Sequence, residues 1–313
     1  MPEQHEQNPR NAILDGYLGY WEATIQKWFA GAADNRFHGC SDDPFLREVE
    51  AFVQPNLMPE PYWGNPFDCS IVIANLNPGG GDDFDRSQPR SAHERAVVWL
   101  ENRIRDAQSY RSVACSFPLL RSETELDAQF GPEQLLSDYG GRHWWRHQSG
   151  RIQWAEYMWH HAAPTATRPF RPFAMELCGW HSSGWNDRAS RAVLSAGETT
   201  RTNGMFRTRV LLPLIEAVKK SDSHLGLCCG ADWNWIFRTG CFREDIRPLC
   251  DPDPIPGDNM NYLASNRRRK YSLFEIDNEN HIVVTSEGRG NPTPHWSSWP
   301  LSIDWLRELK TIR

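Results

Sequence analysis

The chain has 313 residues, of which 39% are hydrophobic and 24% are charged. A chain of this length and composition can bury a large core, so we expect a single α/β domain with additions. The formal charge of −6 excludes a protein that is basic over its whole surface, and any polyanionic partner must therefore meet a local basic patch.

The sequence contains no run of the roughly 20 apolar residues that a membrane helix needs. Its first ten residues, MPEQHEQNPR, also lack the plan of a signal peptide. We therefore expect a cytoplasmic, monomeric protein without a membrane partner. The eight cysteines form no C-x-x-C pair, which argues against a zinc ribbon and favours reduced core residues.

The first half of the chain predicts three helices around one central strand. Apolar residues at helical spacing predict a helix over 11–31, which stops at Gly31. A second helical pattern begins at Asp42. A continuous apolar run over 69–76, rich in β-branched residues, is typical of a strand covered on both faces, and a third helix is expected over 92–107.

Residues 108–170 mix glycine, arginine, histidine and tryptophan without sustained periodicity, and are expected to form an insertion with one or two helices. The elements expected after it are a strand at 173–178, a helix at 207–220 that becomes regular near Pro213, a strand at 224–229, a helix at 231–237, two strands at 271–276 and 281–284, and a helix at 302–312. This alternation favours a three-layer α/β/α sandwich with a central, largely parallel sheet. We expect a helical N-terminal extension over 1–65 and the α/β domain over 66–313.

The stretch SIVIANLNPGGGDDFD, residues 70–85, closes the first strand with Asn77-Pro78 and three glycines. Ligands bind at the carboxyl ends of strands in open α/β sheets, so this loop is placed for chemistry. Asp82 and Asp83 follow the glycines where a nucleotide-binding P-loop needs Lys and Ser or Thr, and the dinucleotide fingerprint is absent. A plain turn made of turn-forming residues is the alternative.

Two short motifs resemble the uracil-DNA glycosylase superfamily. Asn75-Leu76-Asn77-Pro78-Gly79 resembles the G-[LI]-N-P-G motif, particularly of its mismatch-specific uracil/thymine branch, with Asn75 in place of the first glycine. Asn291-Pro292-Thr293, after a late strand, resembles the second motif, H-P-S or N-P-S. The resemblance covers roughly residues 66–311. It implies a uracil-DNA glycosylase-like fold. It also implies hydrolysis of the N-glycosidic bond of a nucleotide that is flipped out of the DNA.

The resemblance implies that Asn77 positions the water that attacks C1′ of the flipped nucleotide. An asparagine carbonyl oxygen can hold a water without being a strong base, which suffices when departure of the base runs ahead of attack. Asn291 or His181 is expected to support the departing base and the phosphates. The residues expected to bind substrate are Pro78, Gly79, Gly80, Trp180, Ser182, Trp185, Thr293, His295, Trp296 and Ser297.

A second polar loop, residues 179–185, follows the strand expected at 173–178. His181 is a candidate donor to the departing base, and Trp180 or Trp185 is a candidate for stacking on the flipped ring, which is worth about 1–3 kcal/mol. The alternative is a histidine that bonds a backbone carbonyl beside tryptophans packed under the loop. A similar segment, residues 295–300, offers hydroxyls for phosphates and an apolar tip for the gap that a flipped base leaves.

DNA is the expected partner, because a basic run is available to track phosphates at Arg267, Arg268, Arg269 and Lys270. We expect no cofactor and no metal, since His143 and His147 at i, i+4 would bind zinc only with a third ligand. The resemblance leaves the target base open, because the superfamily includes phage-defence enzymes that excise glucosylated hydroxymethylcytosine. Two alternatives remain: a hydrolase of free nucleotides, and a catalytically silent sensor that binds nucleic acid through its tryptophans.

Overall fold

The structure is a computed structural model, and it covers the central sheet with most of the helices around it. The residues that it describes are 9–31, 49–54, 57–76, 92–116, 155–156, 158–160, 162–163, 165, 167–182, 187–195, 205–238, 246–248, 271–276 and 281–286. Within these residues no helix is long and apolar enough to cross a membrane.

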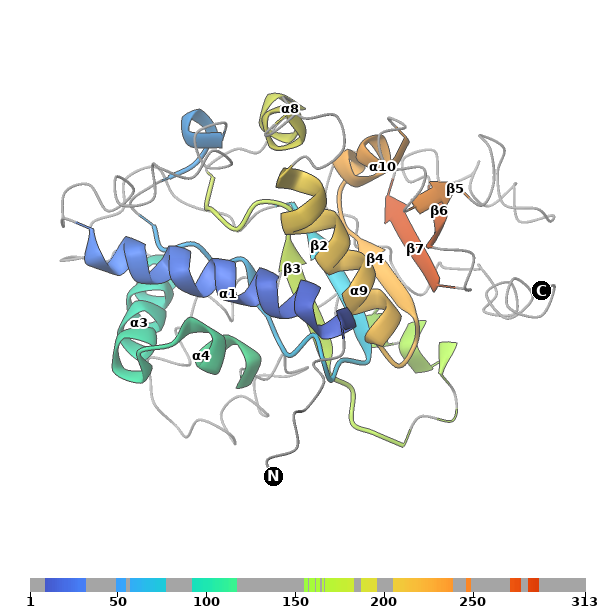
Figure 1. Ribbon diagram of the computed structural model, residues 1–313, viewed down its shortest axis with the longest axis horizontal. Coiled ribbons are helices and arrows are strands. Elements are labelled where there is room, and N and C mark those ends of the chain that lie inside the picture. The colour runs from blue at the N-terminus through green and yellow to red at the C-terminus, as the bar shows by residue number, and fades with distance from the viewer. Residues whose placement is uncertain are drawn as a thin grey trace.

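Among the described residues, seven strands form one mixed sheet in the order β1-β3-β2-β4-β7-β6-β5 (Figure 1). The neighbouring strands that run parallel are β3 (Pro172–Glu176), β2 (Ile71–Asn75), β4 (Leu225–Cys228) and β7 (His281–Ser286). Antiparallel strands flank them, namely β1 (Tyr62–Trp63) on one side and β6 (Tyr271–Ile276) with β5 (Ile246–Pro248) on the other. The α/β class expected from the sequence is confirmed.

The helices follow the apolar spacing of the sequence closely. They are α1 (Pro9–Ala30), α3 (Ala92–Ala107), α4 (Tyr110–Ser116), α8 (Asp187–Ser195), α9 (Leu212–Lys220) and α10 (Ala231–Arg238), with a 3-10 turn η2 (Glu50–Phe52) and a π-helical turn η3 (Arg207–Leu211). The helices expected over 11–31, 92–107, 207–220 and 231–237 are confirmed. The helix expected from Asp42 is described only at its end, as η2, and the one expected at 302–312 lies outside the described residues.

The helix expected at 207–220 is regular only in its second half. The turn Arg207–Leu211 is π-helical and α9 begins at Leu212. Pro213 explains the division, because proline has no N–H to donate to the carbonyl four residues earlier and therefore breaks the regular ladder there.

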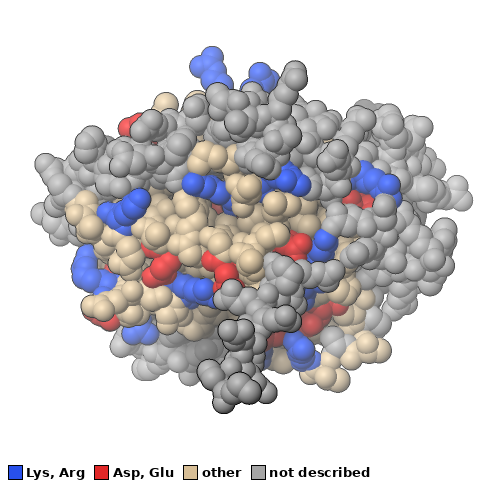
Figure 2. Space-filling model, in the orientation of Figure 1, with Lys and Arg blue, Asp and Glu red and all other residues tan. Residues whose placement is uncertain are grey.

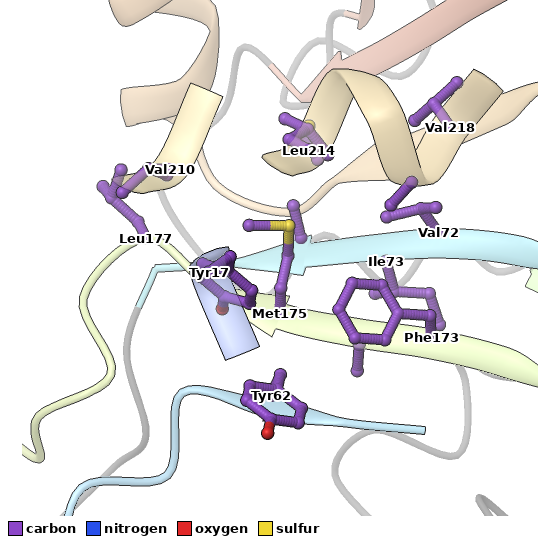
Figure 3. Close-up of a cluster of buried hydrophobic side chains, with 14 of the residues drawn as sticks. Tyr17, Tyr62, Val72, Ile73, Phe173, Met175, Leu177, Val210, Leu214 and Val218 are labelled. Carbon is purple, nitrogen blue, oxygen red and sulfur yellow. The ribbon is translucent and has the colours of Figure 1, made fainter. Parts of the chain in front are cut away.

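The core lies between the sheet and the helices α1 and α9, which cross its front in Figure 1. Every residue of β2 and β3 is buried, as the continuous apolar runs of both strands predict. In Figure 3, Val72 points toward Val218 of α9, and Met175 lies beside Tyr17 of α1. The N-terminal region therefore shares one core with the rest of the sheet, to which it also contributes β1.

Gly226 allows α9 to pack closely on β4. A Cβ at this position would lie 2.8 Å from Cγ2 of Val218 and 3.3 Å from Cγ2 of Val283. Gly19 on the exposed side of α1 differs, since a Cβ there would meet no atom within 4 Å. Close packing therefore requires glycine at position 226, whereas nothing in the packing requires it at position 19.

We predict that Gly226→Ala and Gly19→Ala change stability in opposite directions. Gly226→Ala should lower the free energy of unfolding by about 1–3 kcal/mol, because it overpacks the interface between α9 and the sheet. Gly19→Ala should raise it by roughly 0.5–1 kcal/mol, because alanine favours a helix interior. Urea unfolding followed by circular dichroism measures both, and a loss of the same size in the two variants would contradict the packing described here.

Candidate functional site

The chain reverses its direction across the sheet next to β2. β2 is the first of the parallel strands; the chain goes from it to β3 on one side and then returns past β2 to β4 on the other. From β4 it continues away from β2, toward β7. The carboxyl ends of β2 and β4 thus form a topological switch point, which is the place where open α/β sheets bind ligands.

Leu76, the residue after β2, contacts the residues that follow both neighbouring strands. Its carbonyl oxygen accepts a hydrogen bond of 2.9 Å from the N–H of Cys178, which follows β3. Its side chain packs against Gly230, which follows β4 with φ of +124°, and a Cβ on Gly230 would lie 2.7 Å from Cδ1 of Leu76. The loop that begins with Asn77 therefore leaves the sheet from a rigid point between β3 and β4.

A buried polar pair lies at the carboxyl ends of β2 and β3. Asn75 and Glu176 face each other at the ends of the two strands, and Nδ2 of Asn75 donates a hydrogen bond of 3.0 Å to Oε1 of Glu176. Their exposed fractions are only 3% and 4%. The indole Nε1 of Trp233 on α10 donates to the backbone carbonyl of Asn75 over 3.1 Å. A carboxylate this deeply buried needs such hydrogen bonds, which makes the pair a fixed polar group at the switch point.

Tyr17 of α1 extends this buried polar group. Its hydroxyl donates to the carbonyl of Pro61 over 3.1 Å, and the same carbonyl accepts the N–H of Glu176 over 2.9 Å. Burial raises the pKa of Tyr17 well above its usual value, and the nearby Glu176 carboxylate raises it further. Tyr17 is therefore neutral over the whole physiological range and acts as a hydrogen-bond donor.

Neither Asn75 nor Glu176 is among the residues that the sequence predicts to be functional. Both residues are the single polar position that ends an otherwise apolar strand of five residues. In a parallel sheet such positions lie at the edge where ligands bind. That combination is the signal that would have identified the pair.

Trp180, His181 and Ser182 are buried under the segment that precedes β1. Trp180 and His181 have no exposed surface, and Ser182 is 5% exposed. Nε2 of His181 lies 3.4 Å from Oε1 of Glu60, and the N–H of Glu60 donates to the carbonyl of Gly179 over 2.7 Å.

This burial of Trp180 agrees with the packing alternative for the loop. Gln54 and Glu60 bond the backbone of His181 and Gly179, so stacking by Trp180 or proton donation by His181 requires a change in this buried arrangement. The catalytic and binding roles of these residues stay predictions.

The other predicted site residues lie outside the described part of the chain. They are Asn77, Pro78, Gly79, Gly80, Trp185, Arg267, Arg268, Arg269, Lys270, Asn291, Thr293, His295, Trp296 and Ser297, and the same holds for His143 and His147. Topology alone bears on two of them. Asn77 directly follows the fixed Leu76, and the chain toward Asn291 leaves β7 at the same edge of the sheet, because β7 and β2 are both parallel to β4.

Two of the described thiols near this edge, Cys178 and Cys228, are poorly suited to act as nucleophiles. Burial raises the pKa of Cys178 to about 12, and it raises the pKa of Cys228 well above the usual value for a thiol. Both thiols are protonated at neutral pH and are therefore poor nucleophiles and poor metal ligands. In the part of the chain that the structure describes, no group of three His, Cys, Asp or Glu side chains is arranged to hold a metal ion.

We predict that Gly230→Ala disturbs the exit of the Asn77 loop and lowers stability by about 1–3 kcal/mol, since it combines a strained φ with the contact to Leu76. Leu76→Ala removes the side chain that the new Cβ meets. The double variant should therefore lose less than the sum of the two single variants, by about 0.5 kcal/mol or more. Chemical denaturation of all four proteins measures this coupling, and strict additivity would contradict the contact.

We predict that Asn75→Asp makes stability fall as pH rises. Two carboxylates at hydrogen-bond distance cannot both be ionised when buried, so the folded state raises the pKa of the pair above that of the unfolded chain. The shared proton then stabilises the folded state at low pH and its loss destabilises it at higher pH. The melting temperature of this variant relative to the parent should drop between about pH 5 and pH 8. Asn75→Ala is the control, and an equal drop in both variants would argue against the buried pair.

No family model, curated protein or solved structure matches this chain. Any function is therefore inferred from the molecule itself, from the short motifs at 75–79 and 291–293 and from the topological switch point at the ends of β2 and β4.

Proposed function

We propose that the protein is a DNA N-glycosylase, which flips a modified or mismatched base out of DNA and hydrolyses its N-glycosidic bond to leave an abasic site. The observation that carries the proposal is the position of Leu76, which Cys178 and Gly230 hold at the switch point of the sheet. Asn77-Pro78-Gly79 directly follow Leu76 in the sequence. A motif of the same residue types at any other edge of the sheet would have no such support.

The proposed reaction has two steps, departure of the base and attack of water. The base leaves with the electrons of the N-glycosidic bond and generates an oxocarbenium-like sugar, and water then forms the new bond to C1′ and loses a proton. In the proposed mechanism the Asn77 carboxamide oxygen orients that water. A weak base is sufficient because bond cleavage precedes attack, and positioning supplies most of the rate enhancement.

The proposal also covers the detailed fold and the cellular setting of the protein. We infer a three-layer α/β/α arrangement of the uracil-DNA glycosylase type, which the parallel strands β3-β2-β4-β7 support. The enzyme works on DNA in the cytoplasm as a monomer, without a cofactor. Its substrate is either a mismatched or a modified base, and defence against phage DNA with glucosylated hydroxymethylcytosine is one setting for that activity.

The test is incubation with DNAs that contain uracil, a thymine mismatch, hydroxymethylcytosine or its glucosylated form, followed by mild alkali to reveal abasic sites. We predict that Asn77→Ala lowers excision by about 10²-fold or more, as expected when the attacking water is no longer positioned. DNA affinity should change only a few-fold. The matched control is Asn102→Ala, which changes an exposed asparagine of α3 and should leave excision unchanged.

Three outcomes would overturn the proposal. Equal loss of binding and excision in Asn77→Ala would remove its catalytic role. Salt-dependent DNA binding without any abasic product would favour the sensor alternative. Cleavage of mononucleotides but not of oligonucleotides would favour a hydrolase of free nucleotides.

A further inference from the structure

Asn75 ends β2, two residues before Asn77 in the sequence. Its backbone carbonyl accepts the N–H of Leu177 over 2.9 Å and the indole N–H of Trp233 over 3.1 Å. Its side chain donates to Oε1 of Glu176 over 3.0 Å. The end of β2 is therefore held by β3 and α10, through both the backbone and the side chain of its last residue.

Glu176 differs from the acidic side chains that lie in solvent. Figure 2 shows acidic and basic side chains spread over the face that α1 and α9 form in Figure 1. Glu176 is only 4% exposed, at the carboxyl end of β3. Its backbone N–H donates to the carbonyl of Pro61 over 2.9 Å, and the hydroxyl of Tyr17 donates to the same carbonyl over 3.1 Å. The backbone of Glu176 is therefore anchored to the segment before β1, independently of Asn75.

Stability alone does not account for a polar pair at this position. The preceding residues of both strands, 71–74 and 172–175, are apolar and buried. Replacement of both partners of a buried hydrogen bond by apolar groups of similar shape is often nearly neutral in free energy. A hydrogen bond differs from an apolar contact because it is favourable only over a narrow range of distances and angles. The pair of Asn75 and Glu176 therefore fixes the geometry at the end of β2.

We propose that Glu176 is a positioning residue for base excision, which acts through Asn75 to fix the end of β2 from which the chain continues to Asn77. The inference rests on the proposed function and adds to it a residue that does not contact the substrate. A displacement of about 1 Å at a catalytic group can lower a rate roughly 100-fold. The hydrogen bond between Glu176 and Asn75 therefore controls the rate of excision without contributing to the affinity for DNA.

Strand β6 offers a matched control at the other edge of the sheet. Glu275 is 2% exposed, and its Oε2 accepts hydrogen bonds of 3.2 and 2.9 Å from Arg247 of the neighbouring strand β5. Glu275 pairs with Ile282, the second residue of β7, and β7 runs parallel to β4. Glu275 therefore lies near the amino edge. Its replacement removes an equally buried carboxylate and its bonds to a neighbouring strand, at the edge opposite to the proposed site.

The experiment compares Glu176→Leu, Glu176→Gln and Glu275→Leu with the parent in the full chain. Glutamine keeps an oxygen that accepts the bond from Asn75, whereas leucine has no acceptor. Excision from the DNAs of the test above gives kcat and KM separately. Amide hydrogen exchange, followed by mass spectrometry on peptides that contain Leu177 and Cys178, measures local opening independently of activity.

Thermal unfolding checks that each variant is folded. If Glu176→Leu does not fold, the double variant Asn75→Leu/Glu176→Leu takes its place, because it replaces both partners of the bond by apolar residues.

We expect Glu176→Leu to lower kcat about 10- to 100-fold and to change KM only a few-fold. The amides of Leu177 and Cys178 should exchange roughly tenfold faster in this variant, because the carbonyls of Asn75 and Leu76 that they bond are less firmly held. Glu176→Gln should restore kcat and exchange to within a few-fold of the parent, and Glu275→Leu should match the parent in both.

An unchanged kcat in Glu176→Leu would overturn the proposal, whatever the exchange shows. A loss of kcat in Glu176→Gln as large as in Glu176→Leu would also overturn it, because the charge and not the hydrogen bond would then matter. An equal loss in Glu275→Leu would attribute the effect to general destabilisation. If the parent cleaves no DNA, the glycosylase proposal fails, and exchange alone then decides whether Glu176 fixes the end of β2: faster exchange in Glu176→Leu supports this role and unchanged exchange refutes it.

Discussion

The architecture depends on one close contact, between the side chain of Leu76 and the backbone of Gly230. The contact is possible because glycine has no Cβ and tolerates a φ of +124°. It brings together the segments that leave β2 and β4, on the two sides of the point where the chain reverses its course across the sheet. A side chain at position 230 would push these segments apart at the place where the fold creates a binding edge. The position of Leu76, the last described residue before Asn77, is therefore determined by packing within the sheet.

The polar residues at this edge are arranged from the inside outward. Asn75 and Glu176 form the innermost pair, and Tyr17 and Trp233 connect it to α1 and α10. The pair of His181 and Glu60 forms a second polar contact farther along the loop after β3. A buried carboxylate such as that of Glu176 is costly in free energy unless it is hydrogen-bonded, so a fold that keeps one here accepts a local loss of stability. Such a loss is usual at a functional edge and unusual in the middle of a core.

The sequence predicted the long elements well and the short ones poorly. The helices at α1, α3, α9 and α10 and the parallel strands carry periodic or continuous apolar patterns that extend over several residues, and all of them are confirmed. The edge strands β1 and β5 are too short for any period to be visible, so their pairing is decided by the neighbouring strand. The site was harder to predict from the sequence for a related reason. The loop after Leu76 was noticed because its residue types are unusual. Glu176 stands out in the sequence only as the polar end of an apolar strand, and register is needed to show that its partner is Asn75.

The two edges of the parallel sheet use arginine in different ways. At the amino edge, Arg168 and Arg171 converge on Asp68, and Arg168 also lies 3.8 Å from Asp222, so that charge is balanced between the segments that lead into β2, β3 and β4. Ion pairs of this kind tie surface segments together and add little attraction for a distant polyanion. At the carboxyl edge, Arg188 and Arg191 project from one short helix beside the switch point. The proposed binding of DNA by an acidic protein requires a local concentration of positive potential, because screening limits the reach of each charge to roughly 8 Å at physiological salt.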